Sequence, residues 1–268
     1  MSAPFRGQVV IVTGASGGIG EQLALQLAAQ GARLALAARR AEELERVARS
    51  CVAAGGEALV VATDVGDAAS CRALVERTFD KYGRLDMLVN NAGLGMWAKV
   101  TEVADLSIFE RVMRVNYLGA VYCTVAALPH LTASRGRILC ISSLAGRTGV
   151  PLRSGYAASK HAMAGFFDSL RIELRGSGVS VTLVDPGFVG TGAQGRNLGA
   201  SGAPLGHVPI DLQAAMAPDV CARAAIAAAA ARRRELVMTL RGKIGLWLKL
   251  VAPAFIDGMA AKATARGK

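Results

Sequence analysis

Residues 13–20 read Thr13-Gly14-Ala15-Ser16-Gly17-Gly18-Ile19-Gly20, and this glycine-rich stretch decides the fold. The apolar run Val9–Thr13 leads into it and is predicted to be a β-strand, and Ile19–Gln30 leads out of it as a predicted helix. Glycines let a backbone approach a ligand closely, and the N-terminus of a helix attracts phosphate. A strand, a glycine turn and a helix in this order predict the first unit of a nucleotide-binding sheet.

Two other interpretations of the glycine stretch have to be weighed. It can be a purely structural turn, because its spacing differs from the GxGxxG dinucleotide fingerprint. Gly14–Gly18 also satisfies GxSxG, the nucleophile elbow of serine hydrolases, which needs a downstream acid followed by a histidine. The three histidines, His130, His161 and His207, stand at positions that suit this role poorly, so the hydrolase is disfavoured.

The rest of the chain repeats the alternation of strand and helix. Strands that are apolar along their whole length and are separated by helices indicate parallel pairing with helices on both faces. The predicted fold class is therefore α/β, a single Rossmann-type doubly wound parallel sheet of about seven strands. Further strands are predicted at Arg33–Ala38, Glu57–Ala62, Asp86–Asn90, Gly136–Ser142, Val179–Asp185 and Glu235–Thr239, and further helices at Ala41–Ala54, Asp67–Tyr82, Leu106–His130, Gly155–Arg175 and Pro218–Ala231.

The 268 residues are enough for one α/β domain with a large core. We expect residues 1–240 to form one dinucleotide-binding and catalytic domain. Its glycine-rich stretch at about 187–210 is predicted to be a loop over the substrate site. Residues 241–268 are expected to form a basic amphipathic extension.

Charge and cysteine usage exclude some classes of protein. The formal net charge is +11, but residues 232–268 supply +7 of it, and no nucleic-acid-binding motif accompanies it, so we expect no specific nucleic acid partner. The five cysteines are scattered without a CxxC pair, which argues against a disulfide framework and a zinc site, and we expect no metal. No apolar run approaches the length of a membrane span. These features favour a cytoplasmic location.

Two arginines follow the second predicted strand. In a nucleotide-binding unit this position faces the adenosine ribose, where an acid takes the 2′-hydroxyl group of NAD. Ala38 stands in the place of that acid, and Arg39 and Arg40 can pair with a 2′-phosphate. The pattern predicts NADP(H) as the cofactor. A solvated basic pair at the start of a surface helix is the alternative.

The ends of the third and fourth strands carry further polar groups. Asp64 and Val65 follow the third strand, and the aspartate can accept a hydrogen bond from adenine or cap the next helix. Asn90-Asn91-Ala92-Gly93 follows the fourth strand and offers amides where a ligand passes, although it can also be a simple turn.

The helix predicted at 155–175 carries the residues that point to catalysis. Tyr156 and Lys160 are four residues apart and so share one face of that helix. A nearby ammonium group lowers the pKa of a phenol, which suits an acid or base working near neutral pH. Ser143 ends the fifth strand, and Asn116 lies within an apolar helix, where an amide is costly to bury unless it is hydrogen-bonded.

Taken together, TGASGGIG, NNAG, the helical Asn, the strand-end Ser, YxxxK and Pro186-Gly187 resemble the short-chain dehydrogenase/reductase family over about residues 7–240. The resemblance implies that Tyr156 donates a proton in reduction and accepts one in oxidation. It implies that Lys160 lowers the pKa of the tyrosine and binds the nicotinamide ribose, that Ser143 bonds the substrate oxygen, and that Asn116 holds a relay water.

The same resemblance implies how the cofactor is held. The glycine stretch would line the pyrophosphate, the ends of strands two to four would line the adenosine, and the loop after strand six would surround the nicotinamide. The implied cofactor-binding residues are Gly14, Ser16, Gly18, Ile19, Gly20, Arg39, Arg40, Asp64, Val65, Asn90, Ala92, Gly93, Tyr156, Lys160, Pro186, Gly187, Val189 and Thr191.

The expected activity is the NADP(H)-dependent interconversion of a carbonyl and an alcohol by hydride transfer, with Tyr156 as the acid and base and reduction as the expected direction. The alternative is a non-catalytic NADP(H)-binding or membrane-associated scaffold of the same fold. Three loops, at 93–97, 144–153 and 188–207, are expected to form an apolar substrate pocket, so a small hydrophobic carbonyl or alcohol is the expected substrate. Its predicted apolar residues are Leu94, Met96, Trp97, Leu144, Val150, Leu152 and Phe188.

Two partner predictions remain. The resemblance implies a homodimer or homotetramer paired through the long helices around Asn116 and Tyr156. Residues 241–256 mix lysines with bulky apolar side chains, including Trp247, and such a segment can lie on an anionic bilayer surface as a peripheral membrane contact. Folding over the substrate pocket or packing in a dimer are the alternatives for this segment.

Overall fold

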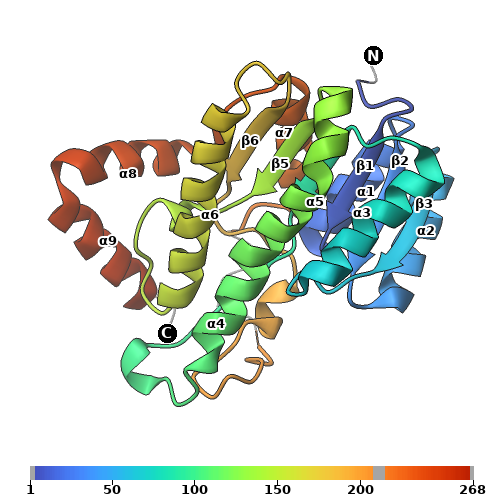
Figure 1. The fold of residues 1–268 in the computed structure, drawn as a ribbon. Helices are drawn as coiled ribbons and strands as arrows, with labels where there is room; N and C mark the ends of the chain where they lie inside the picture. Colours follow the sequence, from blue (N-terminus) through green and yellow to red (C-terminus); the bar gives the residue numbers. More distant parts are fainter. Residues whose placement is uncertain (1–3, 208–214, 266–268) are drawn as a thin grey trace.

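Seven parallel strands form one sheet in the computed structural model, which describes residues 4–207 and 215–265 (Figure 1). The strand order is β3-β2-β1-β4-β5-β6-β7, so the predicted fold class is confirmed. The chain winds outward in one direction from β1 and, after β3, in the other direction from β4. The strands are β1 (Val9–Thr13), β2 (Arg33–Ala38), β3 (Glu57–Ala62), β4 (Met87–Asn90), β5 (Arg137–Ile141), β6 (Ser180–Asp185) and β7 (Glu235–Val237).

Helices cover both faces of the sheet because its side chains alternate between two apolar cores. Val10 and Val12 of β1 face one core, and Val9 and Ile11 face the other, all four fully buried. The first core is closed by α1 (Gly18–Ala28), α2 (Ala41–Ala53) and α7 (Pro218–Ala230), and the second by α3 (Ala68–Tyr82), α5 (Gly119–Ser134) and α6 (Ser154–Glu173).

The predicted long helix Leu106–His130 is present as a continuous helical stretch, residues 107–134, but it contains a π-helical turn that was not predicted. The structure divides this region into α4 (Ser107–Met113), a π-helical turn (Arg114–Leu118) and α5. A π-turn inserts one extra residue into a helix and often marks a functional position, and here it contains Asn116. The apolar periodicity of the sequence continues through the turn, so periodicity alone could not reveal it. Shorter 3-10 turns occur at Val100–Glu102, Leu144–Gly146 and Ala193–Arg196.

The C-terminal part forms two helices, α8 (Leu240–Val251) and α9 (Pro253–Ala265), which extend away from the sheet (Figure 1). Thr239 caps α8 by accepting a hydrogen bond from the Gly242 backbone, and the proline at the first position of α9 suits a helix start. Lys249 ties α8 to the body through its Nζ atom, which donates to the Arg147 carbonyl oxygen at 2.7 Å. Within the described residues, no helix combines the length and apolar character needed to cross a membrane.

The winding of the chain positions the functional site. In a doubly wound sheet, a crevice opens at the carboxyl ends of the strands where the winding direction changes. Here that place lies between β1 and β4, which pair in parallel register from Val10 opposite Met87 to Val12 opposite Val89. The loops that leave β1 and β4 at this edge begin at Gly14 and Asn91. The predicted loop at 187–210 follows β6, which is separated from β4 by β5 in the sheet, and its residues 208–210 lie outside the described part of the chain.

Candidate active site

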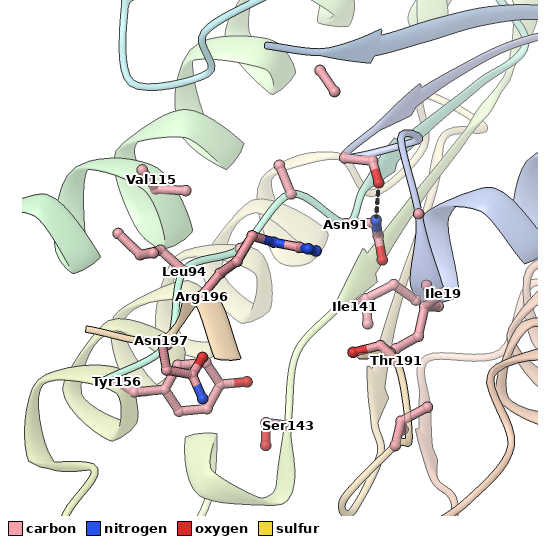
Figure 2. Close-up of a pocket in the computed structure, with 18 of the residues that line it drawn as sticks. Ile19, Asn91, Leu94, Val115, Ile141, Ser143, Tyr156, Thr191, Arg196 and Asn197 are labelled. Atoms are coloured by element: carbon pink, nitrogen blue, oxygen red, sulfur yellow. Dashed lines mark hydrogen bonds between the residues drawn. The ribbon is translucent and has the colours of Figure 1, made fainter. Parts of the chain in front are cut away.

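A cavity of about 380 Å³ opens at this edge of the sheet. Its wall combines the loops that follow strands β1 to β6 with the first turns of α6, and Figure 2 shows Ile19 and Thr191 on one side and Tyr156 and Leu94 on the other. All but three of the predicted site residues line it. The lining predicted residues are Gly14, Ser16, Gly18, Ile19, Arg39, Arg40, Asp64, Val65, Ala92, Gly93, Ser143, Tyr156, Lys160, Pro186, Gly187, Val189 and Thr191.

The glycine stretch turns sharply between β1 and α1. Gly14 has φ of +67°, a left-handed conformation that favours glycine. Gly20, one of the three predicted residues outside the lining, has a different role. A Cβ atom on Gly20 would lie 2.2 Å from the Gly14 carbonyl oxygen, so this glycine lets the first turn of α1 pack against the loop.

The loops after β1 and β4 are fastened to each other. The Thr13 hydroxyl donates to the Val89 carbonyl oxygen at 3.0 Å and accepts from the backbone N–H groups of Asn91 and Ala92 at 3.0 and 3.1 Å. In return the Asn91 amide Nδ2 donates to the Thr13 carbonyl oxygen at 2.9 Å. This network gives one edge of the cavity a fixed backbone, where Figure 2 shows the Asn91 side chain with a hydrogen bond as a dashed line.

The prediction of Asn90 as a residue beside the cofactor needs correction. Asn90 is buried, its Nδ2 atom donates to the Thr124 hydroxyl at 3.0 Å, and it does not line the cavity. The physical reason is the alternation of a strand, since Asn90 is the last residue of β4 and faces the core, whereas the next residue faces the cavity. Asn91, which belongs to the predicted NNAG motif but not to the predicted cofactor-binding residues, lines the cavity instead.

Three arginines gather at the far end of the cavity from Tyr156. Arg40 Nη2 donates to the Ser16 carbonyl oxygen at 3.2 Å and to its hydroxyl at 3.1 Å, which places this guanidinium over the glycine stretch. Arg39 also lines the cavity. Arg196, from the loop after β6, was missed by the sequence reading; burial, followed by the positive charge of Arg40, lowers its pKa. Basic groups this close together suit a ligand with several negative charges.

Tyr156, Lys160 and Ser143 meet at the opposite end. The Lys160 side chain is buried, and its Nζ atom donates to the Ile141 carbonyl oxygen at 2.8 Å and lies 5.9 Å from the centre of the Tyr156 ring. Ser143 Oγ accepts from the Ala145 backbone N–H at 3.1 Å, which fixes its hydroxyl at the end of β5. The ends of α6 and β5 thus present a phenol, an ammonium group and a hydroxyl in one place.

The environment of Tyr156 changes the acidity of its phenol. Burial raises its pKa, but the positive charges of Lys160 and Arg153, together with hydrogen bonding to Ser143 and Arg153, outweigh burial and hold the pKa below its ordinary value. A phenol of lowered pKa exchanges its proton more readily near neutral pH. This is the direction that proton transfer to or from a substrate oxygen requires.

Asn116 is the third predicted residue outside the lining. It is fully buried in the π-turn, and its Oδ1 atom accepts from the Leu94 backbone N–H at 2.7 Å. Its Nδ2 atom donates to the Leu94 carbonyl oxygen and to the Ser159 hydroxyl, both at 2.9 Å. Both amide hydrogens are therefore committed to protein acceptors, and the relay water implied for Asn116 stays a prediction. The arrangement holds the cavity wall next to α6.

The end of the cavity that contains Tyr156 is less apolar than the sequence indicated. Of the predicted apolar residues, only Leu94, Trp97 and Phe188 line it. Arg153 ends the predicted pocket loop at 144–153 but was not predicted as a site residue, and its guanidinium lies close to the rings of Trp97, Phe188 and Tyr156. The predicted residues that do not line the cavity are Met96, Leu144, Val150 and Leu152.

The disfavoured hydrolase interpretation finds no support in the geometry. His130 stacks on Phe79 with ring centres 4.3 Å apart. The Nδ1 atoms of His161 and His207 lie against the carbonyl oxygens of Ala157 and Leu205. None of the three histidines lines the cavity that contains Ser16.

No group of three or more potential metal ligands is assembled among the described residues. No described residue of α8 or α9 lines the cavity, so these two helices do not form its wall. Leu144, the residue after Ser143, packs against the start of α8, where a Cβ atom on Gly242 would lie 2.9 Å from its methyl groups.

Comparison with known protein families gives a match to the short chain dehydrogenase model over residues 8–199. The 11-beta-hydroxysteroid dehydrogenase A of Sesamum indicum is 38% identical over 262 residues, which cover 96% of this chain and 75% of that protein. The 11-beta-hydroxysteroid dehydrogenase-like 4A of Arabidopsis thaliana is 43% identical over 192 residues, and the match covers 71% of this chain and 64% of that protein. The chain thus spans between about two thirds and three quarters of these relatives.

Two solved structures are similar over most of the chain. A short chain dehydrogenase/reductase from Burkholderia phymatum in complex with NAD superposes with a TM-score of 0.83 at 26% identity, covering 94% of this chain and 96% of that one. An alcohol dehydrogenase from Thermococcus sibiricus complexed with 5-hydroxy-NADP gives a TM-score of 0.76 at 28% identity, covering 86% and 95%. The two structures carry different nicotinamide cofactors, so the likeness does not choose between NAD and NADP.

Proposed function

Because the chain belongs to the short-chain dehydrogenase family of oxidoreductases, we propose that it interconverts a hydrophobic ketone or aldehyde and the corresponding alcohol, with NADP(H) as cofactor and Tyr156 as the acid and base. The observation that carries the proposal is the meeting of Tyr156, Lys160 and Ser143 at one end of the cavity, with the pKa of the phenol lowered. The cofactor, when bound, supplies or accepts the hydride.

The chemistry of the protein groups follows from their positions. In reduction, the Tyr156 hydroxyl gives its proton to the substrate oxygen as negative charge develops there, and the Ser143 hydroxyl stabilises that charge by a hydrogen bond. Lys160, held by the Ile141 carbonyl, stabilises the phenolate that remains. In oxidation the same phenolate accepts the proton of the alcohol.

The residues present at the far end of the cavity fit a phosphorylated dinucleotide. Arg39, Arg40 and Arg196 offer several N–H donors close to the glycine stretch, and Ala38 leaves space where an acid would repel a phosphate. We therefore assign the 2′-phosphate of NADP(H) to this arginine cluster. The glycine stretch and the N-terminus of α1 would take the pyrophosphate.

Steady-state assays with NADPH and a panel of ketones and aldehydes of increasing hydrophobicity test the proposal. We expect carbonyl-dependent consumption of NADPH and a preference for NADPH over NADH. NADPH binding without turnover of any carbonyl would instead favour the alternative, a non-catalytic NADP(H)-binding protein.

A second proposal concerns the partners of the chain. The helices α8 and α9 expose Leu240, Trp247, Leu250 and Phe255, each at least 59% exposed, and the basic Arg241 and Lys243 lie on the same helix pair. Apolar side chains flanked by basic ones match the surface of an anionic bilayer, and we propose this as a peripheral contact of residues 241–256.

Sedimentation with vesicles tests the membrane contact. We expect the full chain to bind vesicles that contain phosphatidylserine, to bind neutral vesicles weakly, and to lose binding when Trp247 and Leu250 are both changed to Glu. Self-association that disappears in the double variant, without vesicle binding, would show that a second copy covers this face. We also propose a homodimer or homotetramer, from family likeness alone. The molar mass measured in solution on the same samples distinguishes these states from a monomer.

A further inference from the structure

Arg153 places an arginine guanidinium at the substrate end of the cavity. Its guanidinium carbon lies 4.1 Å from the ring centre of Tyr156, 5.6 Å from that of Phe188 and 5.7 Å from that of Trp97. Three aromatic rings therefore surround the guanidinium, and contacts of this kind stabilise a cation without neutralising it. The edge of the guanidinium, where its N–H groups point, still needs acceptors.

The Tyr156 hydroxyl accepts a hydrogen bond from Arg153, but the protein supplies few other acceptors for this cation. The Arg153 Nε atom is buried and has no hydrogen-bond partner. Within residues 4–207 and 215–265, no carboxylate forms an ion pair with Arg153, whereas the neighbouring Arg147 pairs with Asp185 at 3.0 Å. Arg153 is partly buried, and the partial loss of hydration of a cation that has no anionic partner is costly. A site that retains one is suited to a ligand that brings the anion.

The backbone holds Arg153 in this position. Leu152, directly before it, has φ of +66°, a strained conformation for a leucine, and its carbonyl oxygen accepts from the Ala98 backbone N–H at 2.8 Å. Arg153 itself stands at the N-terminal boundary of α6, where its carbonyl oxygen accepts from the Ala157 N–H at 2.7 Å. The guanidinium is thus presented by a rigid element, three residues before the proposed acid and base.

We propose that Arg153 binds an acidic group of the substrate, so that the preferred substrates are hydrophobic carbonyl compounds or alcohols that carry a carboxylate a short chain of atoms from the reacting carbon. The inference rests on the proposed function and narrows its substrate class. The position of Arg153 between Tyr156 and the two rings lets it hold the carboxylate while the carbonyl oxygen reaches the phenol. Trp97 and Phe188 would contact the apolar part of the same molecule.

Matched substrates test the proposal directly. We would compare a medium-chain gamma-keto acid with its methyl ester, which has nearly the same shape without the charge, using NADPH and the full chain. We expect kcat/KM to favour the acid by about 10- to 100-fold, the range of a charge-assisted hydrogen bond. Arg153→Gln should reduce this preference to about threefold through the KM of the acid, and Arg153→Lys should keep part of it.

Equal use of acid and ester by the unchanged enzyme would overturn the inference, even if Arg153→Gln altered the pH profile. The same result would leave the proposed oxidoreductase function intact, because the ester would still be reduced. The preference for the acid must also be insensitive to Arg39→Ala, which removes an arginine from the cofactor end of the same cavity. A loss of preference in that variant would count against a local role of Arg153.

A binding measurement separates this inference from the catalytic proposal. Trp97 and Trp247 are the two tryptophans of the chain, so Trp247→Phe leaves only the ring beside Arg153. We expect decanoate, and not decanol, to change the fluorescence of this protein with NADP⁺ bound, and the change to disappear in Arg153→Gln. An Arg153-dependent response without turnover of any carbonyl would support the anion site and contradict the proposed function. No difference between decanoate and decanol would contradict the anion site.

Discussion

Asn116 bonds to both backbone polar groups of Leu94, accepting from its N–H at 2.7 Å and donating to its carbonyl oxygen at 2.9 Å. Its second amide hydrogen goes to the Ser159 hydroxyl, which in turn donates to the Tyr156 carbonyl oxygen at 2.7 Å. The π-turn therefore joins the loop after β4 to the first turns of α6. Through these bonds Asn116 acts as a positioning residue for the wall that faces Tyr156.

Replacing Asn116 by Ala should destabilise the fold and weaken catalysis together. The change leaves the N–H and carbonyl of Leu94 and the Ser159 hydroxyl without their partner, and each unsatisfied buried group costs about 1–3 kcal/mol. We expect urea unfolding to show a loss of at least ~2 kcal/mol. Ser159→Ala, which removes one of the three bonds to Asn116, should cost less. If Ser159→Ala lost as much stability as Asn116→Ala, or more, the positioning role of Asn116 would be contradicted.

The arginine cluster should decide cofactor preference. Arg40→Ala removes the guanidinium bonded to Ser16, and we expect the KM for NADPH to rise about 10- to 100-fold, as for loss of a charge-assisted phosphate contact, with little change for NADH. Arg39→Asp should go further and favour NADH. Arg33→Ala is the control. Arg33 begins β2, the strand that leads to Arg39, and it forms an ion pair with Glu57 on the surface. If the ratio of kcat/KM for NADPH to that for NADH were unchanged in Arg39→Asp, the assignment of the 2′-phosphate to the arginine cluster would be refuted.

The lowered pKa of Tyr156 predicts how the rate depends on pH. In oxidation the phenolate is needed, so kcat/KM for the alcohol should rise as pH increases through the pKa of Tyr156, and kcat/KM for reduction should fall over the same range. Lys160→Met removes a positive charge that lowers this pKa. Both pH dependences of kcat/KM, for oxidation and for reduction, should therefore move to higher pH. Lys249→Met is the control, because this lysine bonds the Arg147 carbonyl outside the cavity. Unchanged pH dependences of kcat/KM in Lys160→Met would contradict the proposal that Lys160 lowers the pKa of Tyr156.

Arg147 and Asp185 predict a stability effect beneath the site. Asp185 is fully buried and bonds Arg147 Nε at 3.0 Å; burial raises the pKa of its carboxyl in spite of this arginine. Arg147→Met should cost about 3–5 kcal/mol near neutral pH, because it leaves a buried charge unpaired. In the variant the folded-state pKa rises further above the unfolded value, so stability should be regained as pH falls through it. Urea titrations at several pH values check this. A deficit that stays constant with pH would contradict it.

Much of the sheet could be predicted from the sequence, and for clear physical reasons. The strands β1, β2 and β3 begin and end at the predicted residues, because their apolar runs are followed by glycine or by polar residues. The helix ends move by a residue or two, as at Asp67, which lies outside α3 as its cap and accepts from the Ser70 N–H. Local caps and periodicity carry this information.

The parts that could not be predicted depend on contacts between distant residues. The π-turn around Asn116 follows from packing that periodicity does not report. The choice of Asn91 over Asn90 depends on the last pleat of β4. Arg153 and Arg196 come from loops without a motif, and only the folded chain brings them to the two ends of one cavity. Arg153 stands at the start of a predicted helix without an acidic residue next to it in the sequence, and this feature could have indicated it as a candidate site residue.

The most direct test of the account is Tyr156→Phe, measured by carbonyl-dependent NADPH oxidation and by equilibrium binding of NADPH. The phenyl ring keeps the shape of the cavity wall and removes only the hydroxyl that exchanges the proton. We predict that kcat falls by at least about 100-fold, the lower range for loss of a general acid, while the Kd for NADPH stays within about threefold. A variant that reduced carbonyl compounds at the rate of the unchanged enzyme would contradict the assignment of Tyr156 as the acid and base.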